Sequence, residues 1–338
     1  MLVVYIMVLL MTLIGGVTRL TGSGLSMVEW HPLMGAVPPL TEQAWADVFR
    51  KYQQTPQFQQ VNDWMTLADF RRIFFWEYVH RLFGRTIGLV VIGPWLVLVA
   101  RRRIDRPLAV KTLGLFVLGG LQGVLGWYMV KSGLVDVPAV SHLRLTAHLL
   151  VAFFVAQYAL WIYFGLRPVR GEPAPAGLRA GAWALVGLVV VQVAWGGLMA
   201  GLRAGYVSPT FPSMNGHWLP GIFVDPELGF VASAVWGAAM VHWVHRTLGW
   251  AVLVSVIGFV AWSWRHAPHR ARSATIALAA LTAVQFGLGV ATVMLFVPVP
   301  VAVAHQGVAL LLLSSLTWWL MESRSGARPP GSESGRVS

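Results

Sequence analysis

Eight long apolar runs, separated by charged loops, constrain the fold of this chain more than any other feature. A transmembrane helix needs about 20 predominantly apolar residues. The predicted spans are residues 1–17, 73–99, 108–130, 139–165, 180–201, 231–263, 273–296 and 298–321. Only 11% of the 338 residues are charged, whereas soluble domains carry about 25%. The sequence therefore predicts an all-α integral membrane protein with eight transmembrane helices, and we expect the first to be a retained helix rather than a cleaved signal.

The basic residues predict the orientation of these helices. Arginines follow the second, fourth, sixth and eighth spans, so the positive-inside rule places these segments and both termini in the cytoplasm. The net charge of +12 is thus topology-setting and does not indicate nucleic acid as a partner. Two outer loops result, 18–72 and 202–230, and the first includes a predicted interfacial helix at 41–52. We interpret His31 and His217 in these loops as loop residues or site lids.

The two halves of the chain repeat each other. Matched pairs occur in the same order in both halves, namely Gly15/Gly196, His80/His245, Gln122/Gln285 and His148/His305. Because each half has an even number of spans, both halves enter the membrane in the same direction. This predicts two tandem four-helix bundles related by a pseudo-two-fold axis along the membrane normal. The predicted units are the N-terminal half 1–166, a cytoplasmic linker 167–179, the C-terminal half 180–322 and a disordered tail 323–338.

Four histidines lie inside the predicted spans at repeat-related positions: His80, His148, His245 and His305. Ionisable groups inside a bilayer are costly and usually functional. Neutral imidazole is a ligand of haem iron, and the interior of a helix bundle suits a planar cofactor. Without cysteine, zinc is a poorer fit than haem. The pattern predicts one histidine pair for haem in each half, about 10–12 Å from the outer ends of the helices. His142 is an alternative to His148, and the simplest competing interpretation is four histidines that bond neighbouring helices.

Charged residues accompany the first histidine of each half. Arg81 and Arg85 follow His80, and Arg246 follows His245. Arginine binds carboxylates bidentately, so we predict that these three bind the haem propionates. The alternative is that they extend to the lipid headgroups. Glu77 lies three residues before His80 and shares its helix face, whereas the matching residue in the second half is His242. A carboxylate in one half only predicts that one half does chemistry; the alternative is a structural partner for an arginine.

Two motifs and the order of the four histidines carry a resemblance to a known family. Residues 15–26 (GGVTRLTGSGLS) and 77–81 (EYVHR) resemble the haem A synthase family, and the resemblance extends over about 8–320. It implies oxidation of the C8 methyl of haem O to a formyl group, which makes haem A for terminal oxidases. It also implies a haem b in the second half, a bacterial inner membrane location with the haem sites toward the outer face, and contacts with haem O synthase and terminal oxidase assembly factors.

The resemblance also implies roles for individual residues. His80 and His148 would ligate the substrate haem O, and Glu77 would be the catalytic carboxylate. His245 and His305 would ligate haem b. Some family members carry a cysteine pair in the first outer loop. This chain has no cysteine, so any redox role of such a pair is excluded.

Two other functions compete with a haem-modifying oxidoreductase. A non-catalytic di-haem membrane cytochrome would use the same four histidines for electron transfer. A transporter with parallel repeats would need no haem. The single carboxylate at Glu77 favours the enzyme over the cytochrome, and the repeated histidines argue against the transporter.

Overall fold

The computed structural model describes residues 1–29 and 37–325, and helices dominate it. Eight helices are long and apolar enough to cross a membrane, which confirms the predicted fold class. They are α1 (Leu2–Leu20), α3 (Leu67–Ala100), α4 (Arg106–Lys131), α5 (His142–Gly165), α6 (Ala176–Gly201), α8 (Ala238–His266), α9 (Arg272–Met294) and α10 (Val299–Glu322). Within the described ranges there is no strand, only an isolated bridge between Met214 and His217.

Two helix starts differ from the prediction. The second span starts at Leu67 rather than 73, because Thr66 and Asp69 form a capping box that extends the helix outward. The sixth span, predicted as one helix over 231–263, is two helices: α7 (Gly229–Trp236) and α8 are separated at Gly237, whose backbone is extended. With α8 starting at Ala238, the histidine of this span lies two turns past the helix start.

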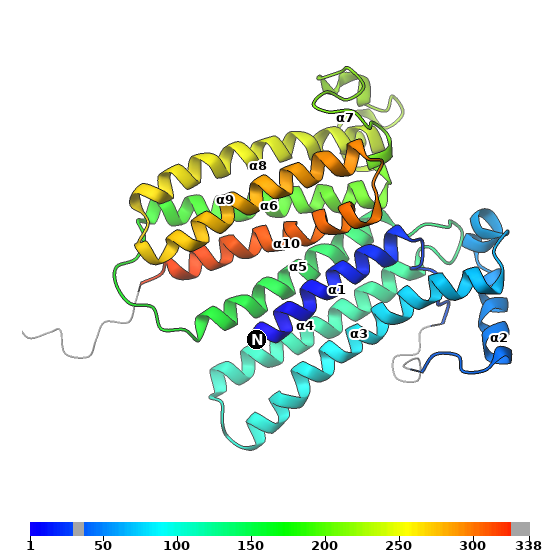
Figure 1. The fold of residues 1–338 in the computed structure, drawn as a ribbon, viewed down its shortest axis with the longest axis horizontal. Coiled ribbons are helices and arrows are strands. Elements are labelled where there is room, and N and C mark those ends of the chain that lie inside the picture. Colours follow the sequence, from blue (N-terminus) through cyan, green and yellow to red (C-terminus); the bar gives the residue numbers. More distant parts are fainter. Residues whose placement is uncertain (30–36, 326–338) are drawn as a thin grey trace, which may run out of the picture.

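The chain forms two helix bundles that lie side by side (Figure 1). In the first bundle α1 packs against α3 and α5, and α4 packs against α3 and α5. In the second bundle α6 packs against α8 and α10, and α9 packs against α8 and α10. The bundles meet where α1 packs on α10, α5 on α6 and α5 on α10. Exchanging α1 with α6 and α5 with α10 reproduces this contact pattern, as a two-fold relation would.

Small and polar residues make the contact between the bundles. A Cβ placed on Gly16 would lie 3.3 Å from Val303, and a Cβ placed on Gly197 would lie 2.7 Å from Thr146. Gly16 matches Gly197 in the repeat and Val303 matches Thr146, so the two contacts are equivalent. Glycine permits such close helix approach in membranes. The hydroxyl of Tyr5 donates to Ser314 across the same interface. The reciprocal contacts support the predicted two-fold relation, and the axis itself stays a prediction.

The outer loops lie at the end of the molecule away from the N-terminus (Figure 1). The helix expected at 41–52 is present as α2 (Glu42–Gln53), and the Thr41 side chain accepts a hydrogen bond from the backbone of Ala44 at its start. Tyr52, Phe70 and Phe74 form the buried core of this cap, which packs α2 on the outer turns of α3. The first bundle therefore has a folded cap above its outer end.

The inner end is held together by arginines that bind backbone carbonyls. Arg270 donates to the carbonyls of Glu172 and Glu322. Arg324 donates to the carbonyls of Phe164 and Arg167 at 2.9 and 2.7 Å. Arg324, within the predicted disordered tail 323–338, thus satisfies carbonyls left open at the end of α5, and the disorder of the tail stays a prediction. The part from 326 onward lies outside the described residues.

Candidate functional site

Each of the four predicted haem-ligating histidines lies against a glycine of a neighbouring helix. A Cβ placed on that glycine would lie very close to the nearest ring atom of the histidine. The distances are 3.1 Å for Gly15 and His80, 3.0 Å for Gly126 and His148, 3.3 Å for Gly196 and His245, and 3.0 Å for Gly289 and His305. A side chain at any of these glycines would crowd the ring, so glycine makes the space for it. The same arrangement occurs in both halves, at repeat-related positions.

The second-half pair has the spacing of two imidazoles on opposite sides of one metal ion. The ring centroids of His245 and His305 are 6.5 Å apart. A metal–imidazole bond is about 2 Å, and a ring centre lies about 1 Å beyond its nitrogen, which gives about 6 Å for two ligands in trans. In the first half His80 and His148 are close enough to interact electrostatically. The spacing therefore fits two histidines that would hold one haem iron in the second half.

Glutamine side chains lie beside three of the four histidines. The Gln192 amide nitrogen donates to the backbone carbonyl of His245 at 3.1 Å and lies 3.5 Å from its Nε2. The Gln285 amide nitrogen lies 3.3 Å from Nε2 of His305. Both amide nitrogens therefore lie near an Nε2 atom of the pair, while Nδ1 of each ring is buried without a hydrogen-bond partner in the described chain. In the first half Gln122 donates to the backbone carbonyl of His148 at 2.8 Å, and Nδ1 of that ring is buried with no partner in the described chain.

These donors suit haem better than an isolated metal ion. Among the described residues, no group of three or more His, Cys, Asp or Glu side chains is placed to hold a metal ion. Two imidazoles complete a haem iron, whose other four ligands belong to the porphyrin, but they leave zinc without enough ligands.

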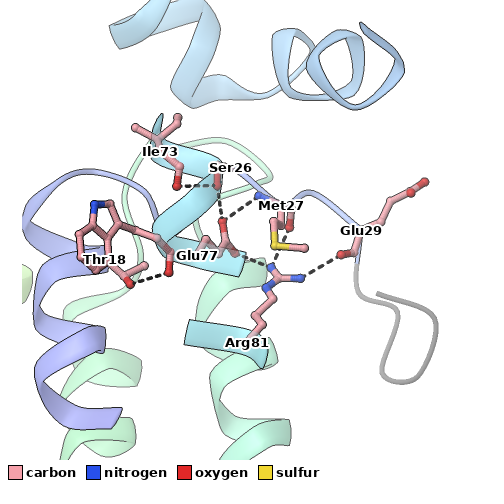
Figure 2. A network of polar contacts seen from close by, with 8 residues as sticks. Thr18, Ser26, Met27, Glu29, Ile73, Glu77 and Arg81 are labelled. Carbon is pink, nitrogen blue, oxygen red and sulfur yellow. Dashed lines mark hydrogen bonds and ion pairs between the residues drawn. The ribbon is translucent and has the colours of Figure 1, made fainter. Parts of the chain in front are cut away.

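Glu77 lies at the centre of a buried polar network (Figure 2). The Ser26 hydroxyl and the Met27 backbone N–H each donate to its Oε2 at 2.7 Å, and Arg81 donates to Oε1 at 2.5 Å. Arg81 also donates to the backbone carbonyls of Met27 and Glu29. Three donors, one of them a cation, thus converge on the two oxygens of this carboxyl group. Glu77 and Arg81 thus fix the loop after α1 over the outer end of the first bundle.

His242 and Arg246 form the corresponding network in the second half. Arg246 Nε donates to Nε2 of His242 at 2.9 Å. The remaining guanidinium nitrogens donate to the carbonyls of Ser208 and Ser213 in the second outer loop, at 2.8 and 3.2 Å. Each half therefore has an arginine that binds its own i−4 neighbour and two carbonyls of an outer loop. Arg81 and Arg246 thus use their donors within the chain. The binding of haem propionates by these two arginines and by Arg85 stays a prediction.

A second layer of polar contacts supports the loop above Glu77. Gln57 donates to the carbonyl of Gly22, which has a positive φ of 68°, a conformation that favours glycine. The Tyr52 hydroxyl donates to Gln57 and accepts from Asn62. Burial raises the pKa of Tyr52, so its hydroxyl keeps the proton that it donates. The cap therefore holds the loop that carries Ser26.

The other histidines lie away from the four-histidine pattern. His142 packs on Gly201 of α6 and its ring meets Trp236 edge-on, with centroids 4.6 Å apart. It belongs to the contact between halves, whereas the His148 ring contacts Gly126 inside the first bundle. His217 is exposed and pairs its backbone with Met214. His31 lies outside the described residues.

The partners of these groups were not predicted from the sequence. Ser26 lies within the first motif, but no pattern linked it to a glutamate 51 residues away. Gln192 was also missed, because its repeat-related position holds Met11 and the pair does not stand out as a match. A polar residue in an apolar span was the available signal for Gln192.

The fold and site define a polytopic helical membrane protein with two repeat-related pairs of internal histidines. The chain belongs to the COX15-CtaA family, described as cytochrome oxidase assembly protein, whose model matches residues 1–317. It is 45% identical to a protein named heme A synthase from Nitrosospira multiformis, over 92% of this chain and 89% of that one. A heme A synthase from Paramagnetospirillum magneticum is 44% identical, over 93% and 90% of the two chains.

Proposed function

We propose that this protein is a haem A synthase that oxidises the C8 methyl of haem O to a formyl group. The observation that carries the proposal is the difference between two otherwise matching sites. Both halves hold a pair of histidines, but only the first has a carboxylate, Glu77, one helical turn from a histidine. The relatives named heme A synthase support the same activity.

In this proposal the two halves divide the work. His80 and His148 of the unit 1–166 bind the substrate haem O, and His245 and His305 of the unit 180–322 bind a resident haem b. The 6.5 Å separation of the second pair's ring centroids supports this, because two histidines that held one haem iron would lie about this far apart. A bound haem b would supply one-electron transfer, with its potential set by its two histidines and the surrounding burial.

The reaction amounts to two successive two-electron oxidations of a methyl group. The first converts the methyl to an alcohol, the second gives a gem-diol, and loss of water leaves the aldehyde. Each oxidation takes two electrons and one proton from the carbon, which becomes cationic. Water then adds to that carbon and releases a second proton, and the two electrons pass to an external acceptor. Glu77 is the catalytic carboxylate in this scheme, as proton acceptor or as electrostatic stabiliser. Ser26, the Met27 backbone and Arg81 hold it in one orientation.

The proposed setting is the bacterial inner membrane, with both termini in the cytoplasm and the haem sites toward the outer face. The basic segments after the even-numbered spans support this orientation. An enzyme that makes haem O would supply the substrate, and assembly factors of terminal oxidases would take the product.

The test is the chemical identity of the haem made by the full-length protein. Membranes from cells that supply haem O, with and without this protein, are extracted and analysed as pyridine haemochromes. Haem A is expected only where the protein is present. If the protein purifies with two haems but no haem A forms, a di-haem electron carrier becomes the better function. If it purifies without haem, both functions are excluded.

A further inference from the structure

The two bundles differ in how the seam between their second and third helices is closed. In the second half Phe286 of α9 packs on Trp250 of α8, with ring centroids 4.7 Å apart. Phe211 of the outer loop contacts both, at 5.9 Å from Trp250 and 6.0 Å from Phe286. Gly289, which the His305 ring contacts, lies one turn from Phe286. Three aromatic rings from three segments thus close the α8–α9 seam beside the second histidine pair.

The repeat-related positions of the first half lack this closure. The match of Gln122 with Gln285 aligns Gly123 with Phe286, and the match of the histidines at 80 and 245 aligns Arg85 with Trp250. A Cβ placed on Gly123 would meet no atom within 4 Å, and the same holds one turn further in at Gly119. Where the second half has packed rings, the first half has open space beside Gly119 and Gly123 of α4, which we call the open α3–α4 seam.

This opening leads to the first histidine pair. Gly126 is one turn beyond Gly123 on the same helix face, and the His148 ring lies against it. Nδ1 of His148 and Oε1 of Gln122 are both buried without a hydrogen-bond partner in the described chain. At the inner end the face continues with Phe116, whose side chain is exposed. On α4 the open face is therefore apolar from Phe116 to Gly123 and ends at buried polar atoms beside a predicted ligand, whereas α3 has Arg85 at the position aligned with Trp250.

We propose that the open α3–α4 seam holds the isoprenoid chain of the substrate haem. The inference rests on the proposed function and adds how the two haems are told apart. Haem O carries a long farnesyl-derived chain where haem b carries a vinyl group. A site for haem O needs an apolar outlet toward the lipid, whereas a site for haem b does not. The open seam occurs in the half assigned to haem O, and the aromatic closure in the half assigned to haem b.

The test restores the missing ring and asks whether the two haems respond differently. Full-length protein from cells that make no haem O is placed in nanodiscs, and haem O or haem b is titrated while absorbance is recorded. The His80→Ala protein supplies the baseline for binding outside the first half. Gly123→Phe is expected to weaken first-half binding of haem O at least tenfold and to change binding of haem b less than twofold. Gly187→Phe is the matched control, because a Cβ on this α6 glycine also meets no atom within 4 Å; it should change neither.

Equal effects of Gly123→Phe on both haems, or an effect on neither, would overturn the proposal. Gly123→Leu, with a smaller and more flexible side chain, is expected to give the same order of effects and replaces the Phe variant if that protein does not accumulate. The result is independent of catalysis. A wild-type protein that binds haem O through this seam but makes no haem A would contradict the proposed function and leave the tail site intact.

Discussion

The first and second bundles share one framework and differ in the chemistry placed on it. Arg81 and Arg246 each bind a side chain four residues earlier and two carbonyls of an outer loop. The bound side chain is Glu77 in the first half and His242 in the second. The loop tether is therefore common to both halves, while a negative charge beside the histidine pair occurs in only one. Tethering an outer loop does not require a carboxylate, which supports the catalytic role proposed for Glu77.

The largest effect is expected from removing a histidine of the second pair. Each iron has two axial positions, and the second bundle offers one pair with suitable spacing. His245→Ala or His305→Ala should therefore remove most of the haem b, while haem O binding to the first half persists. The haem content of purified protein, measured as pyridine haemochromes, checks this. Wild-type haem b in both variants would contradict the assignment.

The next effect compares the two residues that differ between the halves. Glu77→Gln keeps the shape but removes the charge and the proton acceptor, so haem A formation should fall about 10²-fold or more. Haem should still bind in both halves, and haem O or its alcohol should accumulate. His242→Gln is the matched change in the second half and should lower haem A formation far less. Equal losses in the two variants would show that position 77 acts only through its loop.

The stability of the two tethers should also differ. Arg81→Ala leaves the buried Glu77 carboxylate without its cation, which typically costs about 3–5 kcal/mol. Arg246→Ala removes hydrogen bonds to a neutral imidazole and two carbonyls, for about 1–3 kcal/mol. Thermal unfolding in detergent should therefore show a larger loss for Arg81→Ala. A larger loss for Arg246→Ala would mean that the second outer loop, not the ion pair, dominates.

The smallest effect concerns the glutamine that only the second pair has. Gln192 donates to the His245 backbone and approaches its Nε2, whereas the aligned Met11 only packs near Gly84. Gln192→Met removes one hydrogen bond, worth about 1 kcal/mol. The midpoint potential of the second-half haem should shift by no more than about 40 mV, because about 59 mV corresponds to 1.4 kcal/mol for one electron and only the difference in hydrogen-bond strength between the two oxidation states counts. Redox titration measures the shift; Met11→Gln is the reciprocal variant and should leave this potential unchanged.

The sequence by itself determined the membrane architecture and the positions of the four histidines. A segment that crosses lipid must be apolar over its whole length, so spans can be found without knowing their neighbours. The repeat then placed His80 with His245 and His148 with His305, and the structure gives each pair equivalent glycine contacts. The break at Gly237 escaped, because a short helix before it is as apolar as the span itself, and so did the outward extension of α3 to Leu67.

The tertiary structure alone decided what these residues touch. Ser26 reaches Glu77 across 51 positions and Arg246 reaches Ser208 across 38, and no local pattern encodes the path of the loops between them. The 6.5 Å separation of the His245 and His305 rings likewise depends on how α8 and α10 are positioned in the bundle. The closure of one seam by Phe211, Trp250 and Phe286 depends on three segments meeting at one point. Each helix enters the lipid because its own sequence is apolar, whereas contacts between side chains form only after the helices have packed together.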